Sequence, residues 1–185
     1  MIAVMILVVV IVGILIWIGA TYNKMVRLKY RIKQAWSDVD IQLKRRYDLI
    51  PNLVETVKGY ASHERKTLQE VIKARSQAMQ VIQPGKEKGE AENFLSSTLK
   101  SLFALAENYP DLKANKNFVE LQSILSKLEE SIQLARRYYN AVVRDMNVMT
   151  EAFPSNLIAR WFGFKKAEYF LLPSESEREV VKVKF

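Results

Sequence analysis

The sequence has no cysteine in its 185 residues. This absence excludes a disulfide framework, a catalytic thiolate and a lipid-modified cysteine anchor. It does not separate a cytoplasmic domain from an exported one, because a domain with a sizeable core needs no disulfide in either place. The fold must therefore be held by apolar burial and polar contacts.

Glycine and histidine are scarce, with six glycines and one histidine. No G-x-x-x-x-G-K-[ST] or G-x-G-x-x-G motif is present, so no phosphate-binding loop is indicated. His63 precedes Glu64, but Thr67 stands where H-E-x-x-H needs its second histidine, and no G-x-S-x-G elbow accompanies it. We therefore expect no catalytic residue, metal ligand or cofactor, and we interpret His63 as a surface residue.

Charge and proline are both absent from residues 2–20, which are almost entirely apolar. As a helix with a rise of about 1.5 Å per residue, this run would extend roughly 28 Å, close to the hydrocarbon thickness of a bilayer. A cleavable signal peptide would need a basic start and a small-residue cleavage site, and Ile18-Gly19-Ala20 fits poorly. Residues 1–22 are predicted to be a retained transmembrane anchor.

A basic segment without acids follows the run. Its cations are Lys24, Arg27, Lys29, Arg31 and Lys33. The positive-inside tendency predicts a single pass through the cell (inner) membrane, with the N-terminus outside and the rest in the cytoplasm. Trp17 and Tyr22 suit an aromatic belt at the interface. The basic excess is explained equally by anionic lipid headgroups or by a solvated helix face.

Residues 24–82 show helical spacing of apolar side chains, interrupted by Pro51. The seam comprises Trp36, Leu43, Ile50, Val57, Val71 and Ala78, with companions Tyr47, Val54, Ala61, Leu68 and Ile82; Asp40, Glu64 and Arg75 are its exceptions. Because the seam keeps its phase, we predict one long helix, kinked at Pro51 and loosened at Gly59.

Two further helices are predicted after a loop at residues 83–86 that Gly89 extends. One covers about residues 90–108. The other starts at Asn115 and runs for about 35 residues, with all ten of its heptad positions apolar or aromatic. Those positions are Phe118, Leu121, Leu125, Leu128, Ile132, Ala135, Tyr139, Val142, Met146 and Met149. A short amphipathic segment, capped by Ser155 or Asn156, holds Leu157, Trp161 and Phe162.

The predicted fold class is all-α: a transmembrane helix followed by an antiparallel bundle of three long helices and a short C-terminal one. The predicted domains are the anchor at residues 1–22, the helical bundle at 23–172 and a C-terminal tail at 173–185. Residues 180–185 alternate like a strand without a partner strand and are assigned to the tail.

Several motifs along the chain resemble the LemA family of bacterial membrane-anchored proteins. They are YN at 22–23, AW at 35–36, QLKRRYDLIPNLV at 42–54, KGYA at 58–61, HE at 63–64, LFALAENYP at 102–110, KAN at 113–115, ARRYYN at 135–140, FP at 153–154 and FGF at 162–164. One departure is Met146, where the family usually has a tyrosine before Asn147. The resemblance implies a single-span protein with a helical domain and no established activity. Family members are often encoded near membrane proteases, which suggests an adaptor or scaffold. An old association with a sensor kinase finds no kinase signature here.

Two basic clusters are candidate binding surfaces. They are Lys44, Arg45 and Arg46, and Arg136, Arg137 and Arg144. Two interpretations stay open: interhelical ion pairs in an antiparallel bundle, with Asp48 and Asp145 among the acids, or a surface for a partner or an anion.

A group of aromatic residues near the C-terminus is also left with two interpretations. Its members are Trp161, Phe162, Phe164, Tyr169 and Phe170. They either fold back to cap the bundle or contact the bilayer interface or a partner, since Arg160, Lys165 and Lys166 lie among them.

The sequence favours a membrane-anchored, non-enzymatic scaffold or adaptor for protein interactions. Its expected partners are the membrane and a membrane protein such as a protease, with a homo-oligomer also open and nucleic acid not expected. The alternative is a ligand- or stress-sensing module that binds a small molecule or peptide between helices. Polar cavities between helices would favour the sensor, and a tightly packed core with an exposed patch would favour the scaffold.

Overall fold

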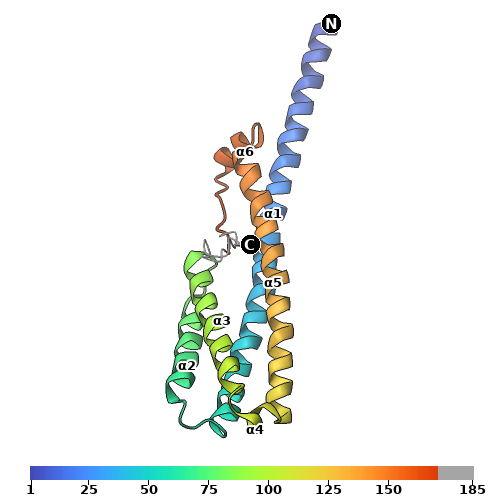
Figure 1. Ribbon diagram of the computed structural model, residues 1–185. Helices are drawn as coiled ribbons and strands as arrows, with labels where there is room; N and C mark the ends of the chain where they lie inside the picture. The colour runs from blue at the N-terminus through green and yellow to red at the C-terminus, as the bar shows by residue number, and fades with distance from the viewer. Residues whose placement is uncertain (171–185) are drawn as a thin grey trace, which may run out of the picture. The chain divides into compact units, whose positions relative to one another are not determined.

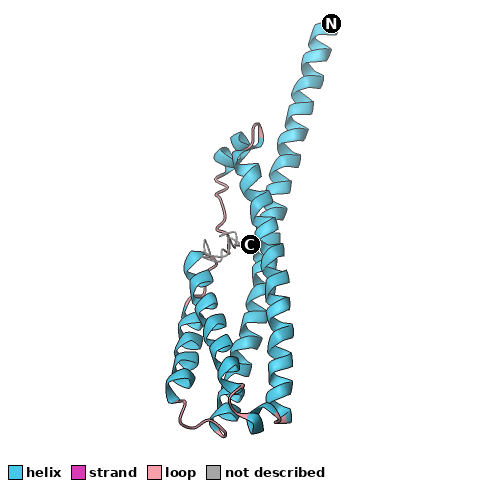
Figure 2. Cartoon of the chain, viewed as in Figure 1, coloured by secondary structure: helices cyan, strands magenta, loops and turns pink. Residues whose placement is uncertain are grey.

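The computed structural model describes residues 1–170, and every regular element in that range is a helix (Figure 2). The helices are α1 (Ile2–Lys58), α2 (Arg65–Gln80), α3 (Lys86–Ala106), α4 (Pro110–Lys113), α5 (Lys116–Glu151) and α6 (Ser155–Phe162). The all-α prediction is confirmed. The predicted tail, residues 173–185, lies outside the described residues.

The prediction of one helix over residues 24–82 is wrong. Helix α1 continues through Pro51 and ends at Lys58, where the amides of Tyr60 and Ala61 donate to the Val57 carbonyl at 3.0 and 2.8 Å. Helix α2 then returns beside the end of α1 (Figure 1). The apolar spacing led to this wrong prediction because seam residues before and after the turn are both buried. Their spacing therefore gives no sign that the chain reverses.

Two smaller predictions are also corrected. Gly89 lies inside α3 and does not extend the preceding loop. Neither Ser155 nor Asn156 caps α6, because Pro154 holds the N-cap position, and the Ser155 hydroxyl donates to the carbonyls of Met149 and Ala152.

The chain forms two compact units, and α1 and α5 contribute to both. Within the described residues, unit 1 holds 1–38 and 135–168, and unit 2 holds 39–134 together with Tyr169 and Phe170. The boundary between the two units crosses α1 between Asp38 and Val39. The predicted boundary between anchor and bundle at residue 23 lies inside unit 1 and stays a prediction.

Unit 2 is a bundle of four helical segments: the end of α1, α2, α3 and the start of α5. Its α1 and α5 segments run antiparallel, because Arg46 contacts Glu129 while Tyr60 contacts Asn115. Helix α2 packs against α3. The core is formed by side chains that are 0% exposed: Val39, Leu43, Ile50, Leu53, Val57, Val71, Ala74, Ala78, Leu95, Leu102 and Leu112.

Unit 1 pairs the first part of α1 with the end of α5 and with α6. The pairing is antiparallel, since the Trp36 ring lies 5.4 Å from that of Tyr139 and Leu28 packs with Met146. Met146, which departs from the family tyrosine, is buried in this cluster. After α6 the chain returns along α5: the Asn147 amide exchanges two hydrogen bonds with the Ala167 backbone, at 3.0 and 2.8 Å.

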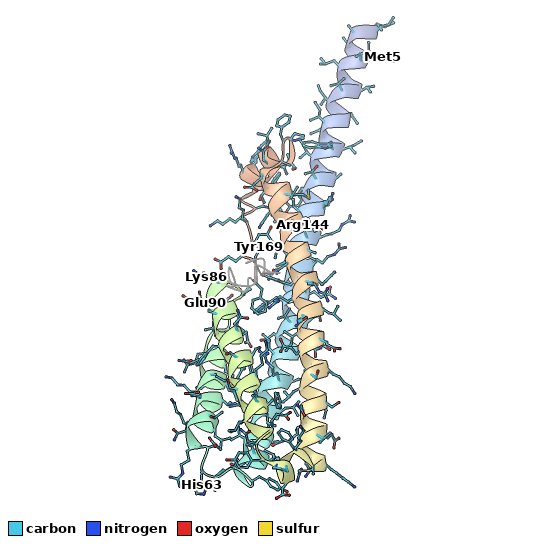
Figure 3. The ribbon with its side chains drawn as sticks, viewed as in Figure 1. Met5, His63, Lys86, Glu90, Arg144 and Tyr169 are labelled. Atoms are coloured by element: carbon cyan, nitrogen blue, oxygen red, sulfur yellow. The ribbon has the colours of Figure 1, made fainter. Side chains whose placement is uncertain are left out.

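The apolar start of α1 is long and apolar enough to cross a membrane, and no residue of its most apolar window is buried in the protein. Side chains such as Met5 project from the helix into open space (Figure 3). A helix this apolar on every side suits a lipid environment.

Candidate functional site

A cluster of charged side chains is buried inside unit 2, and sequence reasoning had named only Arg46 among its basic residues. Arg46 from α1 and Lys88 from α3 are each 2% exposed, and Glu92 of α3 is 4% exposed. The Arg46 Nη2 atom donates to Glu92 Oε2, and its Nη1 atom donates to Glu129 Oε2 of α5 at 2.7 Å. Arg46 thus joins three helices through two ion pairs.

The Lys88 ammonium group makes three contacts within the cluster. It pairs with Glu92 Oε1 at 3.0 Å and donates to the Tyr47 hydroxyl oxygen at 2.9 Å and to the Ala78 carbonyl at 2.8 Å. The Tyr47 hydroxyl in turn donates to Glu92 Oε1. Two cations and two carboxylates, counting Glu129, balance in charge, as burial requires.

Tyr47 is kept in its neutral, donating form. Burial raises its pKa above the ordinary value, and the negative charge of Glu92 and the hydrogen bond to it raise the pKa further. The Tyr47 hydroxyl donates its hydrogen bond to Glu92 and accepts one from Lys88, so both of these partners lie inside the cluster. The buried cluster binds helices together and has the geometry of a structural network.

Arg75 of α2 explains how α1 continues through Pro51. Proline has no N–H, so the carbonyl four residues earlier, that of Tyr47, loses its helical donor. The Arg75 Nε atom donates to this carbonyl at 2.7 Å. Arg75 was an exception in the predicted apolar seam, and its role is to satisfy a backbone group of the neighbouring helix.

Some residues of the two predicted basic clusters are exposed and others are buried. Lys44 and Arg45 are exposed, whereas Arg46 is buried. Its acidic partners are Glu92 and Glu129 rather than the acids named in advance.

On α5, Arg136 is half-buried and Arg137 is exposed. Arg144 is exposed on the outside of α5 and pairs with its neighbour Asp145 at 3.7 Å (Figure 3). The use of these basic residues as a partner surface stays a prediction.

The aromatic residues divide between the two units. In unit 1, Trp161 is 78% exposed and Phe162 is 49% exposed, while Phe164 packs into both apolar clusters. In unit 2, Tyr169 is half-buried and Phe170 is 1% exposed. Phe164 and Phe170 thus pack inward, and Trp161 and Phe162 do not.

His63 is exposed at the turn between α1 and α2, as expected (Figure 3). Across residues 1–170, no group of three or more His, Asp or Glu side chains is arranged to hold a metal ion.

Sequence reasoning missed Lys88 and Glu92 although a signal was present. Counting back by sevens from Leu102 and Leu99, which are buried, leads through Leu95 to Lys88 and directly to Glu92. Arg46 likewise lies midway between Val39 and Leu53, which are fully buried. Charged residues at seam positions indicate a buried ion-pair network.

A comparison with protein families matches residues 35–185 to a model described as the LemA family. The chain is 26% identical over 156 residues to Protein LemA of Metamycoplasma hominis, covering 84% of this chain and 71% of that protein. It is 24% identical over 174 residues to Magnetosome protein MamQ 2 of Paramagnetospirillum magneticum. It is 23% identical over 174 residues to Magnetosome protein MamQ of Magnetospirillum gryphiswaldense. Each of these two matches covers 80% of this chain and 64% of the magnetosome protein, which is under two thirds of its length.

Proposed function

The chain belongs to the LemA family, and from this premise we propose that it is a non-enzymatic scaffold that binds another membrane protein at the cytoplasmic face. The family and the helical fold are those of a membrane-associated helical protein. The scaffold role, the orientation and the identity of the partner are parts of the proposal. The names of the magnetosome relatives describe those proteins, which are longer than the matched region.

The observation that carries the proposal is the buried, charge-balanced cluster of unit 2. Its buried ionisable groups, Arg46, Lys88 and Glu92, have their charges matched by one another and by Glu129. Catalysis needs an ionisable group that a substrate can reach, and these groups are at most 4% exposed. What unit 2 offers another molecule is therefore its outer surface.

Apolar residues on the outside of α2 support docking of a protein partner. Ile72 and Met79 lie seven residues apart, hence on one helix face, and are 51% and 46% exposed. Ile82, just beyond the helix, is 70% exposed. This stripe flanks the buried face of α2 and is the first surface to test.

The alternative, a sensor with a ligand between helices, has weaker support. A groove of about 430 Å³ near the start of α5 is lined by Ala114, Lys116, Val119, Glu120, Ser123, Ile124 and Lys127. All of these residues come from one short stretch of chain, so the groove does not separate two helices as the sensor requires.

In-cell photocrosslinking tests the scaffold. A photoreactive residue would replace Met79, Arg45 or Arg137, with Ser126, an exposed residue of α5, as the control position. We expect one defined membrane protein to be captured from at least one test position and not from Ser126. If Met79 is the capturing position, Ile72→Ser should abolish capture. Recovery of only self-crosslinks or lipid from all three positions would overturn the proposal.

A further inference from the structure

We propose that α6 is a second membrane-contacting element: it lies at the boundary where α1 leaves the hydrocarbon and inserts its exposed aromatic face among anionic headgroups. The inference concerns unit 1 only. It does not depend on the scaffold proposal, because it needs no protein partner.

Contacts with α1 fix the level at which α6 lies. Phe162 at the end of α6 lies 4.7 Å from Tyr22 between ring centroids, and Phe164 lies 5.7 Å from the same ring. Ile158 and Ala159 are buried against Met25. Tyr22 is two residues beyond the apolar run that ends at residue 20, which is about 3 Å along a helix axis.

One contact reaches into the apolar run itself. Ile18 packs against the cluster formed by Met25, Ile158 and Ala159. From Ile18 to Met25 the helix rises about 10 Å, and the headgroup region on one side of a bilayer is about 5–8 Å thick. The part of α1 that α6 covers therefore starts within the last turn of the span and extends through the headgroup layer.

The uncovered side of α6 has the composition of a membrane interface. Leu157 and Trp161, one helical turn apart, are 53% and 78% exposed. Phe153, just before the helix, is 80% exposed, and Phe162 is 49% exposed and stacks with Trp161 at 6.0 Å. Large apolar side chains this exposed are rare next to one another in water, and tryptophan is enriched at the headgroup level.

The charges around α6 complement an anionic leaflet. Residues 152–167 contain Arg160, Lys165 and Lys166 and no acid. All three are exposed, and Lys166 also pairs with Glu151. The basic segment of α1 that begins at Lys24 lies at the same boundary, so the two stretches face one headgroup layer.

These observations favour lipid over protein as the occupant of the aromatic face. A protein partner would have to reach into the headgroup layer beside the span, whereas the lipid is already there once α1 is inserted. The proposal predicts an interfacial helix lying on the membrane, held by α1 on one side and by headgroups on the other.

Spin labelling measures the depth of α6 directly. The chain has no cysteine, so Leu157→Cys gives one unique attachment site in the full-length protein. Matched labels at Val10 and Ser126 provide an immersed and a water-exposed reference. The protein would be reconstituted at low density in phosphatidylglycerol and phosphatidylcholine vesicles, and collisions with oxygen and with a water-soluble nickel complex would be recorded.

We expect the Leu157 label to be shielded from nickel, at a depth between those of the two references. Replacing Trp161 by Ser, or both Lys165 and Lys166 by Gln, should move the label outward, and phosphatidylcholine alone should do the same. A label that is as accessible to nickel as the one at Ser126 would overturn the proposal. Shielding accompanied by spin–spin broadening that disappears on dilution with unlabelled protein would also overturn it, because a second copy would then be the occupant.

Discussion

At the scale of single residues, the central finding is that charged side chains occupy seam positions of unit 2. A buried ion pair contributes little over a well-packed apolar pair, but removing one member leaves the other uncompensated. Glu92 is the only acid of the cluster that is itself buried; it accepts hydrogen bonds from Arg46 and Tyr47 and forms an ion pair with Lys88. The fold therefore depends on Glu92 more than on either cation.

Replacing Glu92 by Leu should lower the free energy of unfolding by about 3–5 kcal/mol, because Lys88 stays buried without its carboxylate partner and Arg46 keeps only Glu129. Denaturant unfolding of the full chain in detergent measures the loss. Glu90→Gln is the matched control: Glu90 pairs with Lys86 at 3.7 Å on the surface of α3, and its loss should cost about 1 kcal/mol or less (Figure 3). Equal effects of the two substitutions would contradict the buried network.

Tyr139 is expected to make the free energy of unfolding depend on pH in the alkaline range. Burial and, to a lesser extent, the charge of Glu168 raise its pKa from 10.0 to about 12. Above the ordinary value the unfolded chain loses this proton while the folded chain keeps it, so stability falls as pH rises from about 10 to about 12. Below that window the contribution is fully present.

Unfolding curves at a series of alkaline pH values measure this effect. Tyr47, whose pKa is also raised, acts in the same direction, so Tyr139→Phe should reduce the slope of stability against pH without abolishing it. An unchanged slope in Tyr139→Phe would show that Tyr139 titrates alike in both states.

At the scale of elements, α1 and α2 are linked by a proline and an arginine. Arg75 donates to the Tyr47 carbonyl that Pro51 leaves without a helical donor. The proline and the arginine are therefore expected to be energetically coupled.

A double-mutant cycle tests this coupling. Arg75→Ala should cost about 1–3 kcal/mol, since it leaves a partly buried carbonyl unsatisfied. Pro51→Ala restores a helical N–H, so in that background the cost of Arg75→Ala should be smaller by at least about 0.5 kcal/mol. Lys73→Ala, at an exposed position of the same helix, serves as control. Additive effects in the cycle would refute the coupling.

Helix α5 carries the second prediction at this scale. Leu125 and Leu128 occupy seam positions and are 4% and 8% exposed. Leu125→Ala or Leu128→Ala should lower stability by about 2–5 kcal/mol, because each leaves a cavity. Ser126→Ala, between them and exposed, should change it by no more than about 0.5 kcal/mol. Thermal melts that do not separate these variants would contradict the register of α5.

At the scale of the whole molecule, we expect the basic segment after the apolar run to set the orientation in the membrane. Replacing its five cations, at positions 24, 27, 29, 31 and 33, with Glu should disturb or reverse the topology, because the charge bias on which the predicted orientation depends is removed. Reporter fusions at the C-terminus, compared between the original and altered chains, measure the orientation. An unchanged orientation would count against the charge argument.

Sequence by itself determined the all-α fold class and the family of this protein. Uniform apolarity marks residues 2–20 as a helix long and apolar enough to cross a membrane, and the heptad spacing of Leu125, Ile132 and their neighbours marks α5, because both patterns follow from local geometry. The family motifs were likewise legible from residues alone, and the family is confirmed.

Only the tertiary structure decided how the helices pair. The reversal after Lys58 is invisible in the seam, since burial on two antiparallel helices produces the same spacing as burial on one. Arg46 pairs with Glu92, which is 46 positions away in the sequence, and with Glu129, which is 83 positions away, so no local pattern specifies these ion pairs. The placement of α6 beside Tyr22 has the same cause: it arises from packing between distant segments, where each residue's environment is supplied by the others.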